Sequence, residues 1–278
     1  MPVRKAIAWT LFWIVLSLAV NAGIYFVFGQ QKAMEFLAGY LIEKSLSVDN
    51  LFVFLMLFTY FGIAPHAQRR ALNYGIAGVL VLRGILIFVG SALVTQFHWI
   101  LYVFGVVLLY SGYKIVTGHQ VEVHPERNIV SRIFKKIVPF KAKHIGEEFF
   151  VKDGGRWKAA PLLLVLIVIE TTDVVFALDS IPAIFGITTD PLIVFSSNLL
   201  AVLGLRSLYF VLEKVQRAFA YVKYGVGIVL AFVGVKMLIA GFYPISTLVS
   251  LTVVMVILGL SVALSVVKKR NSGKRGNL

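Results

Sequence analysis

The sequence predicts an all-α polytopic membrane protein, a bundle of about eight transmembrane helices with an inverted three-helix repeat. Hydrophobic residues make up 59% of the 278 residues and charged residues only 14%, whereas a soluble domain carries roughly 25% charged residues. Several apolar runs approach the ~20 residues that a helix needs to cross a bilayer. In lipid only helices and closed barrels satisfy their own backbone, and these runs are too long for barrel strands.

The apolar runs locate the transmembrane helices in order along the chain. The first run follows Arg4 and Lys5 in the manner of a secretory signal. Its apolar stretch exceeds the roughly 7–15 residues of a signal core, so we expect it to remain as a helix. The expected spans are 7–28, 37–61, 71–95, 99–117, 159–186, 192–212, 224–240 and 244–267.

The positive charges indicate a membrane orientation. A net charge of +14 would suggest nucleic acid as a partner in a soluble protein. Here, if the N-terminus is cytoplasmic, the basic residues of both chain ends and of the 118–158 loop all fall on one side. The other side receives little beyond Lys32. This positive-inside pattern predicts cytoplasmic N- and C-termini, the lipid bilayer as surroundings, and no nucleic-acid partner.

Cysteine is absent from the sequence. This excludes a structural disulfide, an iron–sulfur cluster and a thiolate metal site. The sequence also lacks a glycine-rich dinucleotide turn and a haem-attachment motif. We therefore expect no bound organic cofactor and no enzymatic activity.

Two parts of the chain match each other in the same order at a nearly constant offset. Because three helices separate the partners, each copy runs in the opposite direction, as in the inverted repeats of many transporters. Residues 47–52 match 171–176 at an offset of 124, 82–84 match 205–207 at 123, and 105–114 match 227–236 at 122. We expect one membrane domain, 1–278, in which repeat 1 covers 37–117, repeat 2 covers 159–240, and helices 7–28 and 244–267 flank them.

The 118–158 loop is the one segment with soluble character. Apolar residues between 129 and 138 recur at helical spacing among basic residues, as in a helix that lies on an anionic leaflet. Residues 149–157 resemble a small hairpin with a glycine turn. A solvated basic loop is the alternative interpretation. In either case this loop is the place where a protein partner could bind.

Five acidic residues lie inside apolar helices. A charge at the helix centre costs ~2.5–3.5 kcal/mol even on the mild insertion scale, so compensating groups must exist. Arg83, Arg206 and Lys44 could pair with three of the carboxylates and simply hold the bundle together. The other two would be balanced by protons or by a divalent cation, since carboxylate oxygens suit Mn²⁺, Mg²⁺ and Ca²⁺. The five candidates are Glu43, Asp49, Glu170, Asp173 and Asp179.

Two further residues support an ion site. Pro182 removes a helix hydrogen bond and tends to kink its helix, and a freed carbonyl at membrane depth is a cation ligand. Asn50 directly follows Asp49 and has the best claim among the neighbouring polar residues. Asp179 points roughly opposite Glu170 if their helix stays regular, so the kink at Pro182 would decide whether it joins the site.

The acidic segments carry a family resemblance. Residues 43–54, 170–185 and 204–210 closely resemble signature segments of the TerC/Alx family, and the resemblance covers nearly the whole chain. Members of that family are bacterial inner-membrane proteins, named for tellurite resistance and associated with manganese homeostasis through cation export. The resemblance implies the same membrane and the same role here. It also implies that the five acidic residues match the acidic positions of the family.

The leading hypothesis is a secondary exporter of a divalent cation, with Mn²⁺ as the first candidate. Asp49 and Asp173 would be the central ligands and would face each other across the repeat interface. Glu43, toward the outer face, and Glu170, toward the inner face, would pass the ion or a counter-transported proton. Arg83 and Arg206 would neutralise the empty site between cycles.

Two alternatives stay open at this point. One is a membrane scaffold or metal-loading partner for exported or stress-response proteins, acting through the 118–158 loop. The other is a membrane redox modulator, a label used within the family. The lack of cysteine and of cofactor motifs does not support the redox label.

Overall fold

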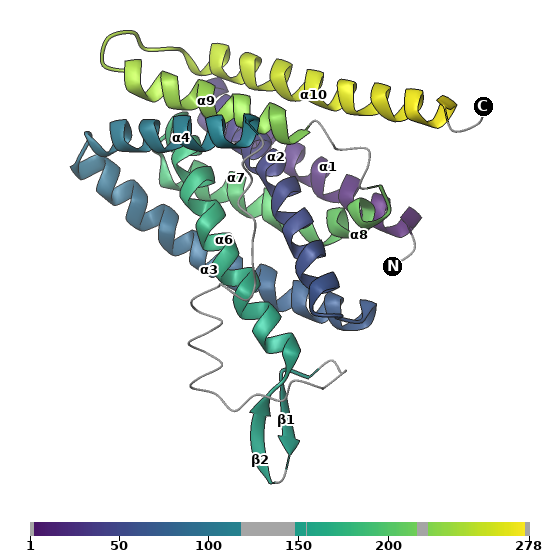
Figure 1. Ribbon diagram of the computed structural model, residues 1–278. Coiled ribbons are helices and arrows are strands. Elements are labelled where there is room, and N and C mark those ends of the chain that lie inside the picture. Colours follow the sequence, from purple (N-terminus) through teal and green to yellow (C-terminus); the bar gives the residue numbers. More distant parts are fainter. Residues whose placement is uncertain (1–2, 118–147, 154, 216–221, 276–278) are drawn as a thin grey trace.

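The computed structural model of the chain describes residues 3–117, 148–153, 155–215 and 222–275. These residues form a helical bundle from which a two-stranded hairpin projects (Figure 1). In chain order the elements are α1 (Val3–Phe28), α2 (Gln30–Tyr60), α3 (Pro65–Gln96), α4 (Ile100–Val116), β1 (Phe150–Asp153), β2 (Arg156–Ala159), α6 (Pro161–Phe185), α7 (Pro191–Leu203), α8 (Leu205–Val215), α9 (Val222–Ile239) and α10 (Thr247–Arg275).

Length and composition confirm the polytopic helical class. Within the described residues, 6 helical stretches are long and apolar enough to cross a membrane, and one of them runs from α7 into α8. The helices α2 and α4 do not meet the same criteria, since α2 carries more charge and α4 has 17 residues. The eight-span count therefore stays a prediction.

Two boundaries differ from those expected. The α2 helix begins at Gln30 rather than near 37, because its first turns carry the polar residues Lys32 and Glu35, which an apolar-run criterion leaves out. The expected span 192–212 is interrupted at Gly204, where α7 ends and α8 begins. Glycine weakens a helix interior, and hydropathy alone does not detect such a break.

Local sequence explains where several helices begin. Proline opens α3, α6 and α7, since its missing N–H is one that the first helical turn leaves unpaired in any case. Asp190 caps α7, because its carboxylate accepts hydrogen bonds from the backbone N–H groups of Leu192 at 3.0 Å and Ile193 at 3.4 Å. These caps fix the loop between α6 and α7.

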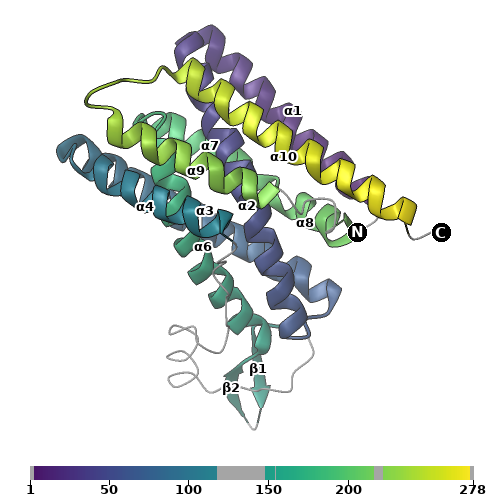
Figure 2. The ribbon, with the colours of Figure 1, turned by 45° about the horizontal axis from the view of Figure 1, so that its top comes forward.

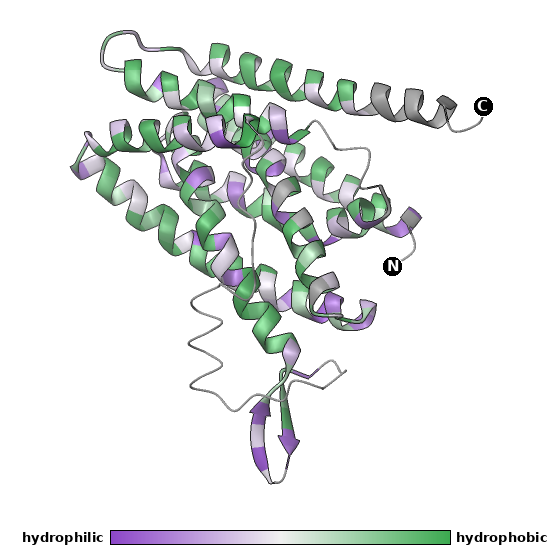
Figure 3. Cartoon of the chain, viewed as in Figure 1, coloured by the Kyte–Doolittle hydropathy of each residue, from purple (hydrophilic) through white to green (hydrophobic). Residues whose placement is uncertain are grey.

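The hairpin predicted near 149–157 is confirmed. Its strands pair antiparallel, with Phe150 opposite Ala159 and Asp153 opposite Arg156, and Gly155 in the turn has a φ of 78°. It continues directly into α6 and stands away from the bundle (Figure 1), and it is more hydrophilic than the helices (Figure 3). The amphipathic segment expected at 129–138 lies outside the described residues.

The helices of the two predicted repeats pack mainly on each other. In this packing α2 contacts α7, α3 contacts α6, and α4 contacts α9. Two views show α4 and α9 running alongside one another (Figures 1 and 2). Both chain ends lie on the same side of the bundle in each view, which agrees with an even number of crossings. The space enclosed by α2, α3, α6 and α7 holds the buried charged residues.

Candidate functional site

Arg83 is the centre of a buried charge cluster. Its side chain, from the middle of α3, is 1% exposed. It donates to Asp173 of α6 twice, from Nε to Oδ2 and from Nη2 to Oδ1, both at 2.8 Å. Its Nη1 donates to Glu43 of α2 in a short contact. Bidentate geometry of this kind makes strong, directional bonds, so one guanidinium holds two carboxylates from two helices.

Glu43 has additional partners. Its side chain is fully buried, and Asn198 of α7 donates from Nδ2 to its Oε2 at 2.9 Å. Ser47, one turn further along α2, donates to Oε1 at 3.2 Å. Asn198 also accepts from Arg83 at 3.4 Å. Asn198 therefore links α7 to α2 and to α3 at the cluster.

Glu170 lies against Gly78 of α3, on the same face of α6 as Asp173. A Cβ added at Gly78 would lie 2.6 Å from the Glu170 carboxyl carbon, so only glycine leaves room for this carboxyl group. The buried Oε2 atom of Glu170 has no hydrogen-bond partner among the described residues. An unpaired buried oxygen is costly, so Glu170 has an oxygen that could take up a further hydrogen bond or a proton.

Asp179 and Pro182 lie apart from this cluster. Asp179 accepts a hydrogen bond from Ser111 of α4 at 2.7 Å and so faces away from Arg83, as expected for a regular helix. The helix does not break in its middle at Pro182. It continues to Phe185, because the hydrogen bond lost to a proline falls in the last turn, where the helix is about to end. Pro182 lies inside α6, in its last turn, and the kink expected there stays a prediction.

The other predicted residues do not join the Arg83 cluster. Arg206 is exposed and forms no ion pair with a described carboxylate, because α7 ends before it and α8 begins beside it. Lys44 donates to the backbone oxygen of Ala201 at 3.1 Å rather than to a carboxylate. The Asp49 side chain lies outside the described residues. Asn50 is 2% exposed, and its Nδ2 atom has no partner in the described part of the chain.

The four predicted acidic residues whose side chains the structure describes do not meet at one point. Across the described residues, no three histidine, aspartate or glutamate side chains are grouped so that they could hold a metal ion. Glu43 and Asp173 are brought together through Arg83, whereas Glu170 and Asp179 contact other helices. In this cluster Arg83 bonds to oxygens of both Glu43 and Asp173, which are the atoms that a cation would need.

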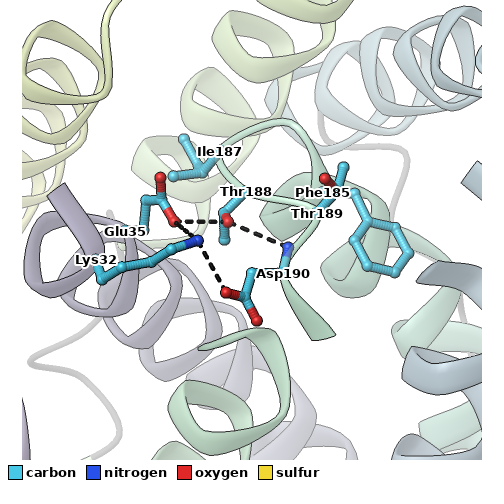
Figure 4. A pocket seen from close by; sticks show the side chains of 7 residues that line it. All are labelled: Lys32, Glu35, Phe185, Ile187, Thr188, Thr189 and Asp190. Carbon is cyan, nitrogen blue, oxygen red and sulfur yellow. Dashed lines mark hydrogen bonds and ion pairs between the residues drawn. The ribbon is translucent and has the colours of Figure 1, made fainter. Parts of the chain in front are cut away.

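A second charged group lines an open pocket of about 480 Å³ (Figure 4). Lys32 of α2 lies 3.2 Å from Glu35 Oε2 and 2.8 Å from Asp190 Oδ2. Thr188 donates to Glu35 Oε2 at 2.7 Å. Sequence reasoning missed this group because acids near helix ends need no special explanation. The available signal was Asp190 directly before a helix-opening proline, a typical capping position.

Lys32 and Asp190, which form an ion pair in the pocket, both have shifted pKa values. The hydrogen bond with Asp190 is the largest reason why the pKa of Lys32 is raised. Desolvation alone would raise the pKa of Asp190, but the hydrogen bonds from Lys32 and from two backbone N–H groups outweigh it and lower the pKa. Both residues therefore stay charged over a wide pH range.

The fold and the buried charges define the class of protein. A polytopic helical bundle with ionisable residues buried at helix centres is typical of membrane proteins that handle ions or protons. The model of the TerC family of integral membrane proteins matches residues 28–273. The chain belongs to the TerC family.

Relatives of this chain come from distant organisms. The chain is 46% identical to Alx of Escherichia coli (strain K12), a protein named as a membrane-bound redox modulator, over 99% of this chain and 89% of that protein. It is 42% identical to the chloroplastic thylakoid membrane protein TERC of Arabidopsis thaliana, over 91% of this chain and 66% of that protein. It is 44% identical to the membrane protein STKORF319 of Myxococcus xanthus, over 97% of this chain and 84% of that protein. No solved structure matches.

Proposed function

We propose that the protein is a secondary exporter of a divalent metal cation, with Mn²⁺ as the first candidate, and not an enzyme. The observation that carries the proposal is that one buried guanidinium is shared by two buried carboxylates. Arg83 holds Glu43 and Asp173, so with both acids ionised the two carboxylates exceed the one base that they share by one negative charge, at a depth where charge is expensive. A structural ion pair needs no such surplus, whereas a site that is visited by a cation does.

Exchange of cations explains the arrangement of the cluster. The guanidinium occupies the position between two carboxylates that a transported ion would take. A divalent cation that replaces Arg83 would match the two negative charges of Glu43 and Asp173, and hard cations prefer such oxygen ligands. Asp49, the repeat counterpart of Asp173, is the second central ligand in this proposal. Asn50 and Asp179 are supporting groups.

Glu170 is the proposed proton carrier. Its Oε2 atom has no partner, and it lies one helical turn from Asp173. Because that oxygen is free, a proton can be taken up there without breaking an existing bond. Counter-transport of a proton would return the charge that the exported cation removes.

The Lys32 pocket is the proposed mouth of the path. Glu35, which contacts Lys32 in the pocket, precedes Glu43 by two turns of α2, about 12 Å along the helix. The positive-inside pattern puts this end of α2 outside the cytoplasm. In the proposal the chain lies in a bacterial inner membrane with both ends cytoplasmic, and export contributes to manganese homeostasis and tellurite resistance.

The test measures Mn²⁺ flux into or out of proteoliposomes that contain the purified protein. We expect Asp173→Asn and Asp49→Asn to reduce the flux at least tenfold, because each removes a central negative charge. Asp153→Asn on the hairpin is the matched control and should leave the flux unchanged. Equal flux in all three variants would remove the assignment, and competition by Mg²⁺ and Ca²⁺ would rank the ions.

A scaffold or metal-loading role is the second candidate. The observation that favours it is the projecting hairpin, where Trp157 is 66% exposed and Phe150 is 49% exposed. Exposed aromatic residues of this kind are common in protein interfaces. If protein from which residues 118–158 have been deleted still transports Mn²⁺ in proteoliposomes, this loop is not needed for transport and the scaffold role is not the primary function.

A redox role is suggested by the name of the Alx relatives. In this chain it would have to work without thiols, because the sequence contains no cysteine. Purified protein with a visible absorption band or flavin fluorescence would support the redox role. We expect neither.

A further inference from the structure

Ser180 of α6 differs from the other buried serines. Its side chain is 1% exposed, and its Oγ atom has no hydrogen-bond partner among the described residues. The remaining buried serines in the described part of the chain each donate a hydrogen bond, most of them to a carbonyl one turn back in their own helix. Ser250 of α10, for example, donates to the Ser246 oxygen at 3.0 Å. A buried hydroxyl without a partner costs free energy, so Ser180 lacks the usual structural explanation.

The packing of α2 against α6 has a constant register. Thr188, just after α6, donates to Glu35 of α2 at 2.7 Å. One turn further into the bundle, a Cβ added at Gly39 would lie 3.2 Å from Cγ2 of Ile184. Four residues forward in α2 therefore match four residues back in α6, and the two helices run in opposite directions.

The same register pairs Ser180 with Glu43, one turn further along. Glu35, Gly39 and Glu43 are spaced by four residues and so share one face of α2. Ser180 and Glu43 are both buried, at 1% and 0% exposure. The unpaired hydroxyl therefore lies at the level of the Arg83 cluster, opposite the acid that α2 contributes to it.

Asn198 of α7 presents a neutral oxygen to the same cluster. Its amide lies between a carboxylate, which only accepts, and a guanidinium, which only donates, so both ends of the amide are fixed. The Nδ2 atom donates to Glu43 at 2.9 Å, and Oδ1 therefore points to Arg83, at 3.4 Å. A cation in the place of the guanidinium would meet this oxygen together with those of Glu43 and Asp173.

We propose that Ser180 is a ligand of the transported cation. Its Oγ atom and the Oδ1 atom of Asn198 complete the oxygen shell that the two acids begin. The inference rests on the proposed binding of a divalent cation in place of the Arg83 guanidinium. Hard cations take about six or more oxygen ligands, which two carboxylates cannot supply alone. Affinity rises with the charge of the ligands, so neutral oxygens fill the shell without holding the ion too tightly for release.

Ser180→Ala should weaken cation binding without a loss of stability. The hydroxyl has no partner, so its removal leaves no other group unpaired, and the unfolding temperature without metal should stay the same or rise. Equilibrium dialysis in detergent should give a Mn²⁺ dissociation constant at least about tenfold higher than that of the parent. Ser250→Ala, at a buried serine of α10, is the control and should bind Mn²⁺ like the parent. A lower unfolding temperature with unchanged Mn²⁺ binding would show a structural role and overturn the proposal.

A sulfur at position 180 gives a spectroscopic test that needs no transport. The chain has no cysteine, so Ser180→Cys introduces one thiol, and thiolates favour soft ions over Mn²⁺. We expect Cd²⁺ to bind this variant with a thiolate–cadmium absorption band in the ultraviolet, and Ser250→Cys to give none. Addition of Asp173→Asn, or of Glu43→Gln if the first variant unfolds, should weaken Cd²⁺ binding at least about tenfold. A missing band, an equal band in the control, or a band that both acid variants leave unchanged would overturn the proposal.

Mn²⁺ flux in proteoliposomes separates this inference from the export function. If the parent transports Mn²⁺ and Ser180→Ala binds it as tightly as the parent does, export stands and the ligand assignment fails. If Mn²⁺ binding depends on Ser180 but the parent shows no flux, the ligand assignment stands and export fails.

Discussion

The Arg83 cluster and the Lys32 pocket contain the same chemistry in opposite surroundings. In each, one basic side chain lies between two carboxylates, and α2 contributes to both. The Arg83 side chain is 1% exposed, whereas the Lys32 side chain is 34% exposed. Water can replace a lost partner in the pocket but not in the cluster. Equal substitutions should therefore have unequal effects, and four variants test this comparison.

The largest effect is expected for Arg83→Leu. Removal of one partner of a buried ion pair typically costs about 3–5 kcal/mol of unfolding free energy, and here it leaves both Glu43 and Asp173 without their base. Denaturant titration in detergent micelles measures the loss. Lys152→Met on the hairpin, which also removes one positive charge, is the control. A loss below about 1 kcal/mol would mean that water reaches the cluster, and the contrast with the pocket would disappear.

The second-largest loss of stability is expected for Gly78→Ala. The added methyl group would lie 2.6 Å from the Glu170 carboxyl carbon, and overpacking of this kind costs about 1–3 kcal/mol. In α1, Gly23→Ala is the control, since an added Cβ there meets nothing within 4 Å. Thermal unfolding is measured for both glycine variants, for Glu170→Ala and for the double variant Gly78→Ala/Glu170→Ala. The double variant should lose less stability than the two single losses together. Strict additivity would contradict the contact.

Asn198→Leu should lower the free energy of unfolding by as much as Gly78→Ala or by less. It removes the bond to Glu43 Oε2, and an unsatisfied buried acceptor costs about 1–3 kcal/mol. The exposed Asn73 of α3 provides the control Asn73→Leu. If both asparagine variants unfold at the same denaturant concentration as the parent, the amide does not hold Glu43.

The smallest loss of unfolding free energy is expected for Lys32→Gln. It should be about 0–1 kcal/mol, as is typical of a partly exposed ion pair. Its pH dependence is more informative. Asp190, with a lowered pKa, contributes stability above its unfolded pKa of about 3.9, and this is lost as the pH falls through its folded pKa. Lys32, with a raised pKa, contributes stability below its unfolded pKa of about 10.4. This stability is lost as the pH rises through its folded pKa.

Hydrogen exchange tests that window. The amide protons of Leu192 and Ile193 are bonded to Asp190 and should be protected between about pH 4 and pH 10. The protection should fall below that range as Asp190 takes up a proton. If the protection, after correction for the intrinsic exchange rate, fell at no acidic pH at which the protein stays folded, the carboxylate would not hold the helix end.

The helical class and the buried cluster were partly predictable from the sequence. Long apolar runs with charges inside them predict helices and buried partners on physical grounds alone, so the pairing of Arg83 with acidic residues could be anticipated. Which acids it meets depends on helix rotation, and rotation by one residue exchanges neighbouring faces. Glu43 and Asp173 could therefore not be chosen over Asp179 from spacing alone.

The differences arose where local geometry overrides composition. Arg206 is exposed because the helix turns at Gly204, a single residue within an otherwise apolar run. Pro182 lies in the last turn of α6, which continues to Phe185, and apolar runs alone do not place that helix end. The Lys32 pocket depends on residues far apart in sequence, and only the folded chain brings Lys32 next to Asp190.

The hairpin offers a practical handle on the bundle. Ala160 donates its backbone N–H to Phe149 at 2.9 Å, so the two strands are fastened to the first turn of α6 with no free linker. A tilt of α6 would therefore displace the tip of the hairpin. A fluorophore or a conformation-selective antibody fragment attached at the exposed Trp157 could then report a movement of α6 without a change to the buried charges.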